Sequence, residues 1–251
     1  MAEHTNVNTV VVSGYTTKNI RNFGTDGVSF GVAVGVKVGE EDGKPVYKNG
    51  FVNVTGSRSK LDVKPGVRVT VTGYQSINTF TPKGSDKEVV QNIIIAQSCV
   101  DFDREVQSEV KITGYVADNI KNFGEKGISF GLGFGVKVGE KDGKPVYKNS
   151  FLNVKGSTTN LGEVTPGSRV TITGFKSFEF FTPSGSDKEV AKEVLVGMSV
   201  EVLENTASES PEKETVPEEP VPTEEVPAPT AEEEPEVPEV EEEEETEDIP
   251  F

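Results

Sequence analysis

Aromatic residues alternating with asparagines, with lysines beside them, are the part of this sequence best suited to binding chemistry. In "VYKNGFVNV", Val52 and Val54 have the parity of a core-facing strand surface, and the other parity faces solvent. Flat rings can stack on nucleic acid bases, and lysines can neutralise phosphates. The candidate contacts from this stretch, from the preceding strand and from a second copy are Lys37, Tyr47, Lys48, Phe51, Asn53, Lys137, Tyr147, Lys148, Phe151 and Asn153. The alternative is that these aromatics cap a barrel end or fill a dimer interface.

A second aromatic group lies in "SINTFTPKGSDKEV" and "SFEFFTPSGSDKEV". Phe80 and Phe181 occupy equivalent places beside a hairpin rich in Thr, Pro, Gly and Ser, and Phe178 and Phe180 enrich the second copy. Aromatic residues near loops, where no core needs them, are more often contact residues than packing residues. We therefore add Phe80 and Phe181 to the candidate binding face.

The strand before this face has unusually small residues on one side. In "VSFGVAVGVKV", the residues from Val28 to Val38 alternate, and one parity holds Ser29, Gly31, Ala33 and Gly35. Glycine weakens a strand, so repeated glycines on one face indicate either close approach of a ligand or tight packing against a neighbouring domain. We assign Phe30 and Phe130, which have the opposite parity, to the core.

The sequence contains no recognisable catalytic centre. His4 is the only histidine, Cys99 is the only cysteine, and no nucleophile elbow, phosphate loop or metal-ligand spacing appears. The glycine-rich run 31–39 is not followed by a helical pattern, which argues against a nucleotide loop. We expect a protein that is not an enzyme and needs no metal or cofactor.

The net charge of −17 comes from the C-terminal segment. Residues 204–251 contain 20 acidic residues and one basic residue, whereas residues 1–203 carry a net charge of +2. Any site for a polyanion must therefore gather its cations on one face of a nearly neutral body.

An internal repeat organises that body. The segment from Tyr15 to Leu61 recurs 100 residues later with 30 of 47 positions identical. Beyond it the second copy has one inserted residue, so the offset becomes 101. Period-2 alternation and the Asp-Gly turns in "EDGKPVY" and "KDGKPVY" indicate β-strands. We expect an all-β protein with domains at 1–102 and 108–203, each a barrel or sandwich of about five strands.

The segment 204–251 is rich in proline and glutamate and too poor in apolar residues to fold, so we expect it to be disordered. It ends in an apolar tip after a run of acids, which indicates a hook for a pocket on another protein. The N-terminus has no pattern of a signal peptide, and no apolar stretch is long enough to span a bilayer. We expect a cytoplasmic protein that does not bind membranes.

The order "TVVVSGYTTKNIRNFGTDGVSFGVAVGV", "VYKNGFVNVTG", "VKPGVRVTVTGYQS" and "EVVQNIIIAQSCVDF" resembles the bacterial single-stranded DNA-binding protein family. The resemblance implies two tandem OB-fold five-stranded barrels followed by a disordered acidic tail. It also implies a tip that binds replication, recombination and repair proteins, and Asp248, Ile249, Pro250 and Phe251 match that tip. Phe80, seven residues after Gly73, and Phe181, after Gly174, match a base-stacking aromatic of the family.

This chain departs from the family pattern at its other stacking positions. It contains no tryptophan, and Asn49 and Asn149 stand where a stacking residue of the third strand is expected, so Tyr47 and Phe51 would have to substitute. The segment "SRSKLDVKPG" is shorter than the family's helix-bearing connection and predicts a single helical turn or none. Members with one domain form tetramers, so with two domains per chain a homodimer could present four domains or a monomer could work with two. The monomer form is familiar from phage and mobile-element proteins.

Two rival functions remain open at this stage. One is a surface protein with β-repeats on a Pro/Glu-rich stalk, which would require an export signal and an anchor. The other is an OB-fold module that binds RNA or protein. The resemblance favours a protein of the bacterial nucleoid, possibly encoded by a phage or plasmid, that protects single-stranded DNA with little sequence specificity.

Overall fold

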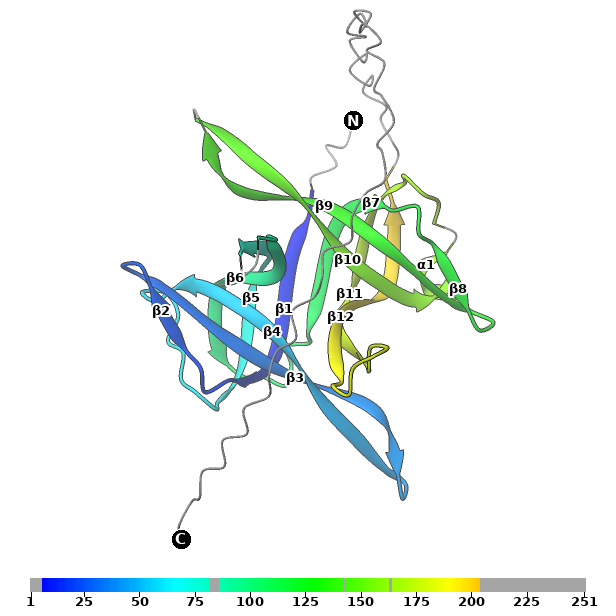
Figure 1. Ribbon diagram of the computed structural model, residues 1–251, viewed down its shortest axis with the longest axis horizontal. Coiled ribbons are helices and arrows are strands. Elements are labelled where there is room, and N and C mark those ends of the chain that lie inside the picture. Colours follow the sequence, from blue (N-terminus) through cyan, green and yellow to red (C-terminus); the bar gives the residue numbers. More distant parts are fainter. Residues whose placement is uncertain (1–5, 82–85, 142, 163, 204–251) are drawn as a thin grey trace, which may run out of the picture. The chain divides into compact units, whose positions relative to one another are not determined.

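The computed structural model describes residues 6–81, 86–141, 143–162 and 164–203, and these are almost entirely β-strands and their connections (Figure 1). The first repeat contains β1 (Asn8–Thr16), β2 (Arg21–Phe23), β3 (Gly27–Glu41), β4 (Lys44–Ser57), β5 (Arg68–Phe80) and β6 (Val89–Asp101). The second contains β7 (Glu109–Val116), β8 (Lys121–Phe123), β9 (Gly127–Lys141), β10 (Lys144–Ser157), α1 (Thr158–Leu161), β11 (Arg169–Phe181) and β12 (Val190–Val202).

The strands of each repeat close into a barrel. In the first repeat β1 pairs antiparallel with both β3 and β5, and β4 pairs in parallel with β6. The antiparallel pairs β3–β4 and β5–β6 complete the ring, and β7, β9, β10, β12 and β11 repeat it in the second half. A closed five-stranded barrel with this crossed order is the OB-fold. The predicted fold class of two tandem OB barrels is therefore confirmed, whereas the domain limits at 102 and 108 stay predictions and the predicted disordered tail lies outside the described residues.

A glycine permits each closure. A Cβ atom on Gly14 of β1 would lie 2.3 Å from the carbonyl oxygen of Ala33 in β3, and one on Gly114 would lie 2.5 Å from that of Gly133. Real Cβ atoms do not come so close to a backbone oxygen, so any other residue would push the two strands apart. The barrel closes at this point because β1 and β7 have no side chain there.

The core follows the predicted alternation only along the barrel part of each long strand. Val28, Phe30 and Val32 are buried, and Phe130 is buried in the second copy, as expected. Val38, assigned to the same face, is 42% exposed because β3 continues beyond the barrel. The β3–β4 and β9–β10 hairpins therefore extend as two arms, here the first arm (residues 37–48) and the second arm (residues 137–141 and 143–148), which are visible in Figure 1.

The two repeats belong to one compact unit and share a sheet. Strand β1 pairs antiparallel with β7, with Val10 opposite Val110. Each arm reaches the other repeat: Lys48 of the first arm forms an ion pair with Glu189, and Lys148 of the second arm forms one with Glu88 at 3.6 Å. The shared sheet joins the two barrels, and each arm adds an exposed ion pair with the other repeat.

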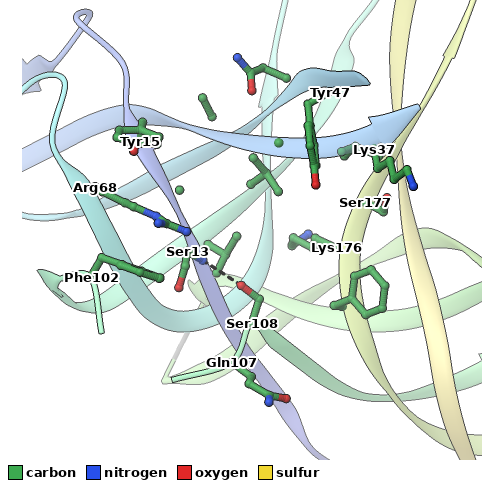
Figure 2. Close-up of a pocket in the computed structure, with 18 of the residues that line it drawn as sticks. Ser13, Tyr15, Lys37, Tyr47, Arg68, Phe102, Gln107, Ser108, Lys176 and Ser177 are labelled. Atoms are coloured by element: carbon green, nitrogen blue, oxygen red, sulfur yellow. Dashed lines mark hydrogen bonds between the residues drawn. The ribbon is translucent and has the colours of Figure 1, made fainter. Parts of the chain in front are cut away.

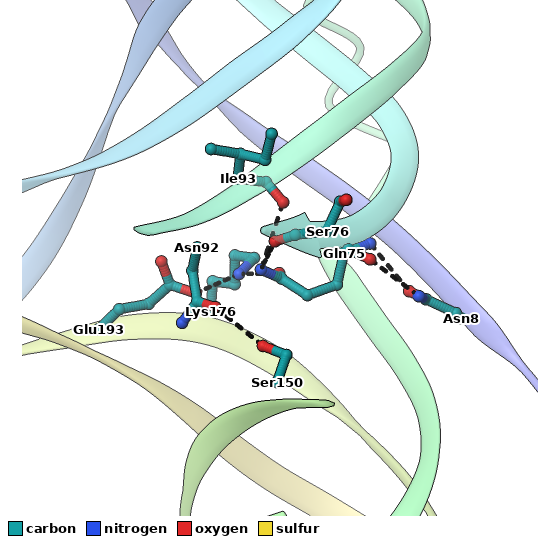
Figure 3. Close-up of polar contacts among 8 residues, drawn as sticks. All are labelled: Asn8, Gln75, Ser76, Asn92, Ile93, Ser150, Lys176 and Glu193. Carbon is teal, nitrogen blue, oxygen red and sulfur yellow. Dashed lines mark hydrogen bonds and ion pairs between the residues drawn. The ribbon is translucent and has the colours of Figure 1, made fainter. Parts of the chain in front are cut away.

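A buried polar cluster lies between the repeats (Figure 3). The ammonium of Lys176 donates to Oε1 of Gln75 at 2.6 Å and forms an ion pair with Glu193. The Gln75 amide nitrogen donates to the carbonyl oxygens of Ser76 and Ile93, each at 3.3 Å. Gln75 and Lys176 occupy equivalent positions of the two repeats, so the interface joins a neutral residue to its charged counterpart.

Packing beside this cluster is equally asymmetric. A Cβ atom on Gly50 would lie 2.0 Å from the ring of Phe178, so the glycine makes room for that ring. The equivalent of Gly50 is Ser150, whose hydroxyl donates to Oδ1 of Asn92 at 3.3 Å. Phe178 is buried and packs between the repeats, unlike the contact residues with which the sequence grouped it.

The short connection after the fourth strand matches its prediction. In the first repeat it is a turn, and in the second it is the single helical turn α1, where Ser157 accepts from the Thr159 N–H at 3.0 Å. Within the described ranges no helix is long and apolar enough to cross a membrane. The same residues hold no group of three or more His, Cys, Asp or Glu side chains that would suit a metal ion.

Candidate nucleic-acid interface

Phe51 and Phe80, two of the predicted aromatic residues of the first repeat, lie in one groove on the outside of the barrel. This hollow of about 610 Å³ is here the Phe51 groove; its lining includes Arg21, Gly31, Phe51, Asn53, Asn78 and Phe80. Phe51 is 55% exposed and Phe80 is 43% exposed. Sequence parity predicted that Phe51 and Asn53 face outward, and the structure places both beside Phe80.

Strand pairing brings these residues together from two directions. Phe51 lies opposite Ala33 and Asn53 opposite Gly31 across the β3–β4 pair. Phe80 ends β5, and Asn78 faces Gln91 across the β5–β6 pair. Because alternate residues of a strand share a face, Asn78 and Phe80 both point to the groove. The floor between the two walls is the small-residue side of β3.

The glycine in this floor has a structural role. A Cβ atom on Gly31 would lie 2.8 Å from Cγ2 of Thr17, and the Gly31 N–H donates to Oγ1 of Thr17 at 3.2 Å. Gly131 lies in the same way beside Ala117 and Asn119. At 31 and 131 residues of the same repeat fill the space beside the glycine, so neither a closely approaching ligand nor packing against a neighbouring domain explains these two glycines.

The second repeat has a smaller and more charged hollow at the equivalent place. This site of about 190 Å³ is here the Glu179 groove, lined by Lys121, Asn153, Lys155, Glu179 and Lys192 among others. Lys155 and Glu179 form an ion pair across it. Phe151 and Phe181 are exposed, at 63% and 46%, but they do not belong to the described lining of this hollow.

The predicted lysines lie on the arms and do not belong to the described lining of the Phe51 groove. Lys37 forms an ion pair with Glu40, and Lys137 pairs with Glu140 at 2.5 Å. Lys137 and Lys148 line a hollow of about 330 Å³ together with Tyr74, Asn78 and Thr79 of the first repeat. The cations of the second arm therefore lie next to Asn78, which also lines the Phe51 groove.

The predicted tyrosines lie at the base of the arms. Tyr47 faces Lys37 across the β3–β4 pair, and Tyr147 faces Lys137 in the second repeat. Each is 62% exposed. Neither belongs to the described lining of the Phe51 groove or the Glu179 groove, so these rings form a separate part of the surface.

Several residues of the grooves were absent from the sequence prediction. Asn78 was detectable, because it shares the parity of Phe80 on the same strand. Arg21 comes from the three-residue strand β2, which carries no periodicity of its own. The Lys155–Glu179 pair joins residues of β10 and β11 that only the barrel closure brings together. The predicted tip, Asp248 to Phe251, lies outside the described residues.

Comparison with solved structures gives the same fold. The wild-type single-stranded DNA-binding protein from Thermus aquaticus matches with a TM-score of 0.53 and 13% identity, covering 82% of this chain and 97% of that chain. A deletion mutant of the Thermus aquaticus protein matches with a TM-score of 0.51 and 14% identity, covering 82% and 98%.

A Plasmodium falciparum SSB complex with ssDNA overlaps 41% of this chain at 12% identity, and its TM-score of 0.33 carries no structural argument. No family model matches the chain, and no curated protein matches its sequence. At identities of 13% and 14%, the likeness to the Thermus aquaticus structures shows that this chain shares their fold.

Proposed function

We propose that this chain binds single-stranded DNA with little sequence preference and without catalysing a reaction. The observation that carries the proposal is the Phe51 groove, where two exposed phenylalanines, three asparagines and Arg21 line the outer face of an OB barrel. Rings in an open groove can stack on unpaired bases of any type. The Thermus aquaticus proteins with the same fold carry single-stranded DNA binding in their names.

Phosphate neutralisation supplies the second part of the mechanism. The arm lysines form ion pairs whose side chains are 43–61% exposed. Exposed ion pairs contribute only about 0–1 kcal/mol, so Lys48 or Lys148 can exchange its glutamate for a phosphate at little cost. Binding should then weaken with salt, because each neutralised phosphate of a single strand lowers the slope of log K against log salt by about 0.7.

The acidic tail has two proposed roles. Its tip would dock into pockets on replication, recombination or repair proteins in the bacterial cytoplasm, with Phe251 as the apolar anchor. Its negative charge would also compete with DNA for the cationic arms. Removing residues 204–251 should therefore raise DNA affinity at low salt, and unchanged affinity would contradict the competition.

The test of the function is fluorescence anisotropy of labelled oligo-dT titrated with the full chain at several salt concentrations. We expect salt-sensitive binding that weakens by about tenfold or more when Phe51→Ala and Phe151→Ala are combined, because each stacked base contributes about 1–3 kcal/mol. Val100→Ala is the matched control, because Val100 is 56% exposed on β6 and lies outside the described lining of the Phe51 groove. No binding by the full chain or by a chain lacking 204–251 would overturn the proposal.

Competition separates single-stranded DNA from other nucleic acids. Unlabelled oligo-dT should displace the probe, and duplex DNA of the same length should not, because paired bases cannot stack on the groove. If oligo-U displaced the probe better than oligo-dT, the ligand would be RNA and the DNA proposal would be wrong.

A further inference from the structure

A larger hollow lies between the first barrel and strands β11 and β12 of the second. This site of about 830 Å³ is here the Tyr15 groove; its walls come from β1, the first arm, the connection 102–108 and β11. Figure 2 shows Tyr15, Arg68 and Phe102 along one wall and Tyr47 with Lys37 along another. The Ser13 N–H donates to Oγ of Ser108 at 3.0 Å, which fixes the connection against β1.

Aromatic rings and a guanidinium form a stack in this groove. The Arg68 guanidinium lies 3.5 Å from the centroid of the Phe102 ring and 5.8 Å from that of Tyr15. The Phe102 N–H donates to the Arg68 carbonyl oxygen at 3.2 Å, so the backbone also holds this pair in place. Tyr15 is 54% exposed, and Tyr47 is 62% exposed across the groove. These rings are available to a planar ligand.

The charge of the groove has one sign. The described residues that line it include four cations and no carboxylate: Lys37, Arg68, Arg104 and Lys176. Lys176 is buried in the interface cluster, and Lys37 pairs with Glu40, whereas Arg68 and Arg104 are exposed. The groove therefore combines exposed rings with a positive field, which suits a ligand that is both planar and anionic.

Strand register connects the Tyr15 groove to the Phe51 groove. Arg68 pairs with Tyr15, Tyr15 pairs with Ala33, and Ala33 pairs with Phe51. Directly paired residues point to the same face of a sheet, so these four form one row across β5, β1, β3 and β4. Strands lie about 4.8 Å apart, which places Tyr15 about 10 Å from Phe51 with only the methyl group of Ala33 between them.

We infer that single-stranded DNA leaving the Phe51 groove crosses Ala33 and continues into the Tyr15 groove, where Tyr15 stacks on a base and Arg68 contacts the backbone. The inference rests on the proposed function and extends its binding site. The acidic tail is the competing occupant, but the only aromatic residue in 204–251 is Phe251, whereas the groove offers several rings. Continuity with the Phe51 groove favours DNA.

The second repeat offers a matched comparison. Arg169, Tyr115, Gly133 and Phe151 form the equivalent row. However, the hollow beside Tyr115 is only about 330 Å³, residues Asn6 to Asn8 line it, and Arg169 donates to Oδ1 of Asn6 at 2.7 Å. Leu203 replaces Phe102 and is buried. We therefore expect the DNA path to continue past the phenylalanine on the first repeat and not on the second.

The test compares Tyr15→Ala with Tyr115→Ala on oligo-dT of increasing length, from about 4 to about 30 nucleotides, the range of one to two OB folds. We expect Tyr15→Ala to bind the shortest oligomers like wild type and to lose about tenfold affinity for longer ones, because those lose one stacked base. Tyr115→Ala should lose less, and Tyr15→Phe, which keeps the ring, should bind like wild type.

The outcomes separate this inference from the proposed function. If the wild-type chain bound no oligomer of any length, the proposed function would fail. If it bound normally and Tyr15→Ala matched it at every length, only the continued path would be wrong. An effect of Tyr15→Ala that disappears when residues 204–251 are removed would assign the groove to the tail. Thermal unfolding of each variant shows whether the fold is retained.

Discussion

The Phe51 groove and the Glu179 groove occupy equivalent places on two barrels, yet their surfaces differ in charge. The first contains Asn78 and Arg21 with two exposed rings, and its described lining has no carboxylate. The second contains Glu179 at the place of Asn78, paired with Lys155 at the place of Thr55. Glu179 repels phosphates and pairs with Lys155, but Lys121 and Lys192 also line this groove, so the charges alone do not rank the two repeats. We expect the Phe51 groove to bind more strongly because its lining holds two exposed rings.

Removing the rings from one repeat at a time tests how much each groove contributes to oligo-dT affinity. Phe51→Ala combined with Phe80→Ala should weaken oligo-dT binding by about 30-fold or more, because each stacked base contributes about 1–3 kcal/mol. Phe151→Ala combined with Phe181→Ala should cost less than about tenfold. Anisotropy at one fixed salt concentration measures both, and equal losses would show that the barrels bind alike.

The interface cluster provides a second comparison, this time in stability. Glu193→Ala leaves the buried Lys176 ammonium with only the Gln75 oxygen as an acceptor among its described contacts. Removing one partner of a buried ion pair costs about 3 kcal/mol of unfolding free energy. The equivalent change in the first repeat, Asn92→Ala, removes one hydrogen bond from Ser150 and should cost about 1 kcal/mol.

Urea unfolding of both variants measures these losses, provided that the slope of the unfolding free energy against urea concentration is the same in each variant. Exchanging both charges for the neutral residues of the first repeat, with Lys176→Gln and Glu193→Asn, should restore most of the stability. If Glu193→Ala cost no more than Asn92→Ala, the charged half of the interface would have no special role.

Strand parity predicted which residues of each repeat face solvent, and this part of the site was available from the sequence. Tyr47, Phe51, Tyr147 and Phe151 are all exposed, and Phe30 and Phe130 are buried. Parity is a local property, so it predicts a face but not what covers that face. The sequence alone therefore could not show that Phe178 fits over Gly50 of the other repeat.

Cations were harder to place than rings, for the same reason. The sequence predicted Lys48 as a phosphate contact, but it could not show that the first arm brings Lys48 to Glu189 and within 5.4 Å of the Phe180 ring centroid of the second repeat. Likewise, the row from Arg68 through Tyr15 to Phe51 requires the register of four strands. Such contacts depend on barrel closure, which alternation does not encode.

Exchanging Glu179 and its equivalent, Asn78, between the grooves tests the effect of the carboxylate on binding. In a chain that carries Phe51→Ala and Phe80→Ala, adding Glu179→Asn removes the carboxylate and releases Lys155 for phosphate. We expect the remaining oligo-dT affinity to rise about fivefold, equivalent to about 1 kcal/mol, and the salt dependence to become steeper.

The reciprocal change is Asn78→Glu in an otherwise wild-type chain, which places a carboxylate in the Phe51 groove. It should lower affinity by a similar factor. If neither exchange altered binding, the charge at this position would not distinguish the two repeats. Any difference in their affinity would then have to come from the placement of the rings.

The smallest expected effect concerns the turn after β4, where different local structures are formed in the two repeats. Asp26 of the first repeat accepts from the hydroxyl of Ser57, and from the hydroxyl and N–H of Ser59, each at 2.8 Å. These hydrogen bonds hold the pKa of the Asp26 carboxyl below its usual value, and the bond from the Ser57 hydroxyl has the largest effect. The second repeat has Lys126 at this position and forms α1 instead.

Asp26→Asn should therefore lower stability slightly at neutral pH and leave acid stability unchanged. Because the folded-state pKa is the lower one, the stabilisation is present above the unfolded value of about 3.9 and is lost as pH falls through the folded-state pKa. Thermal unfolding from pH 7 down to about pH 3 should show the two melting temperatures converge, with Lys126→Asn as the control that changes no such hydrogen bond. A gap that stayed constant with pH would mean that the carboxylate charge does not hold the turn, and that the two repeats differ there only in shape.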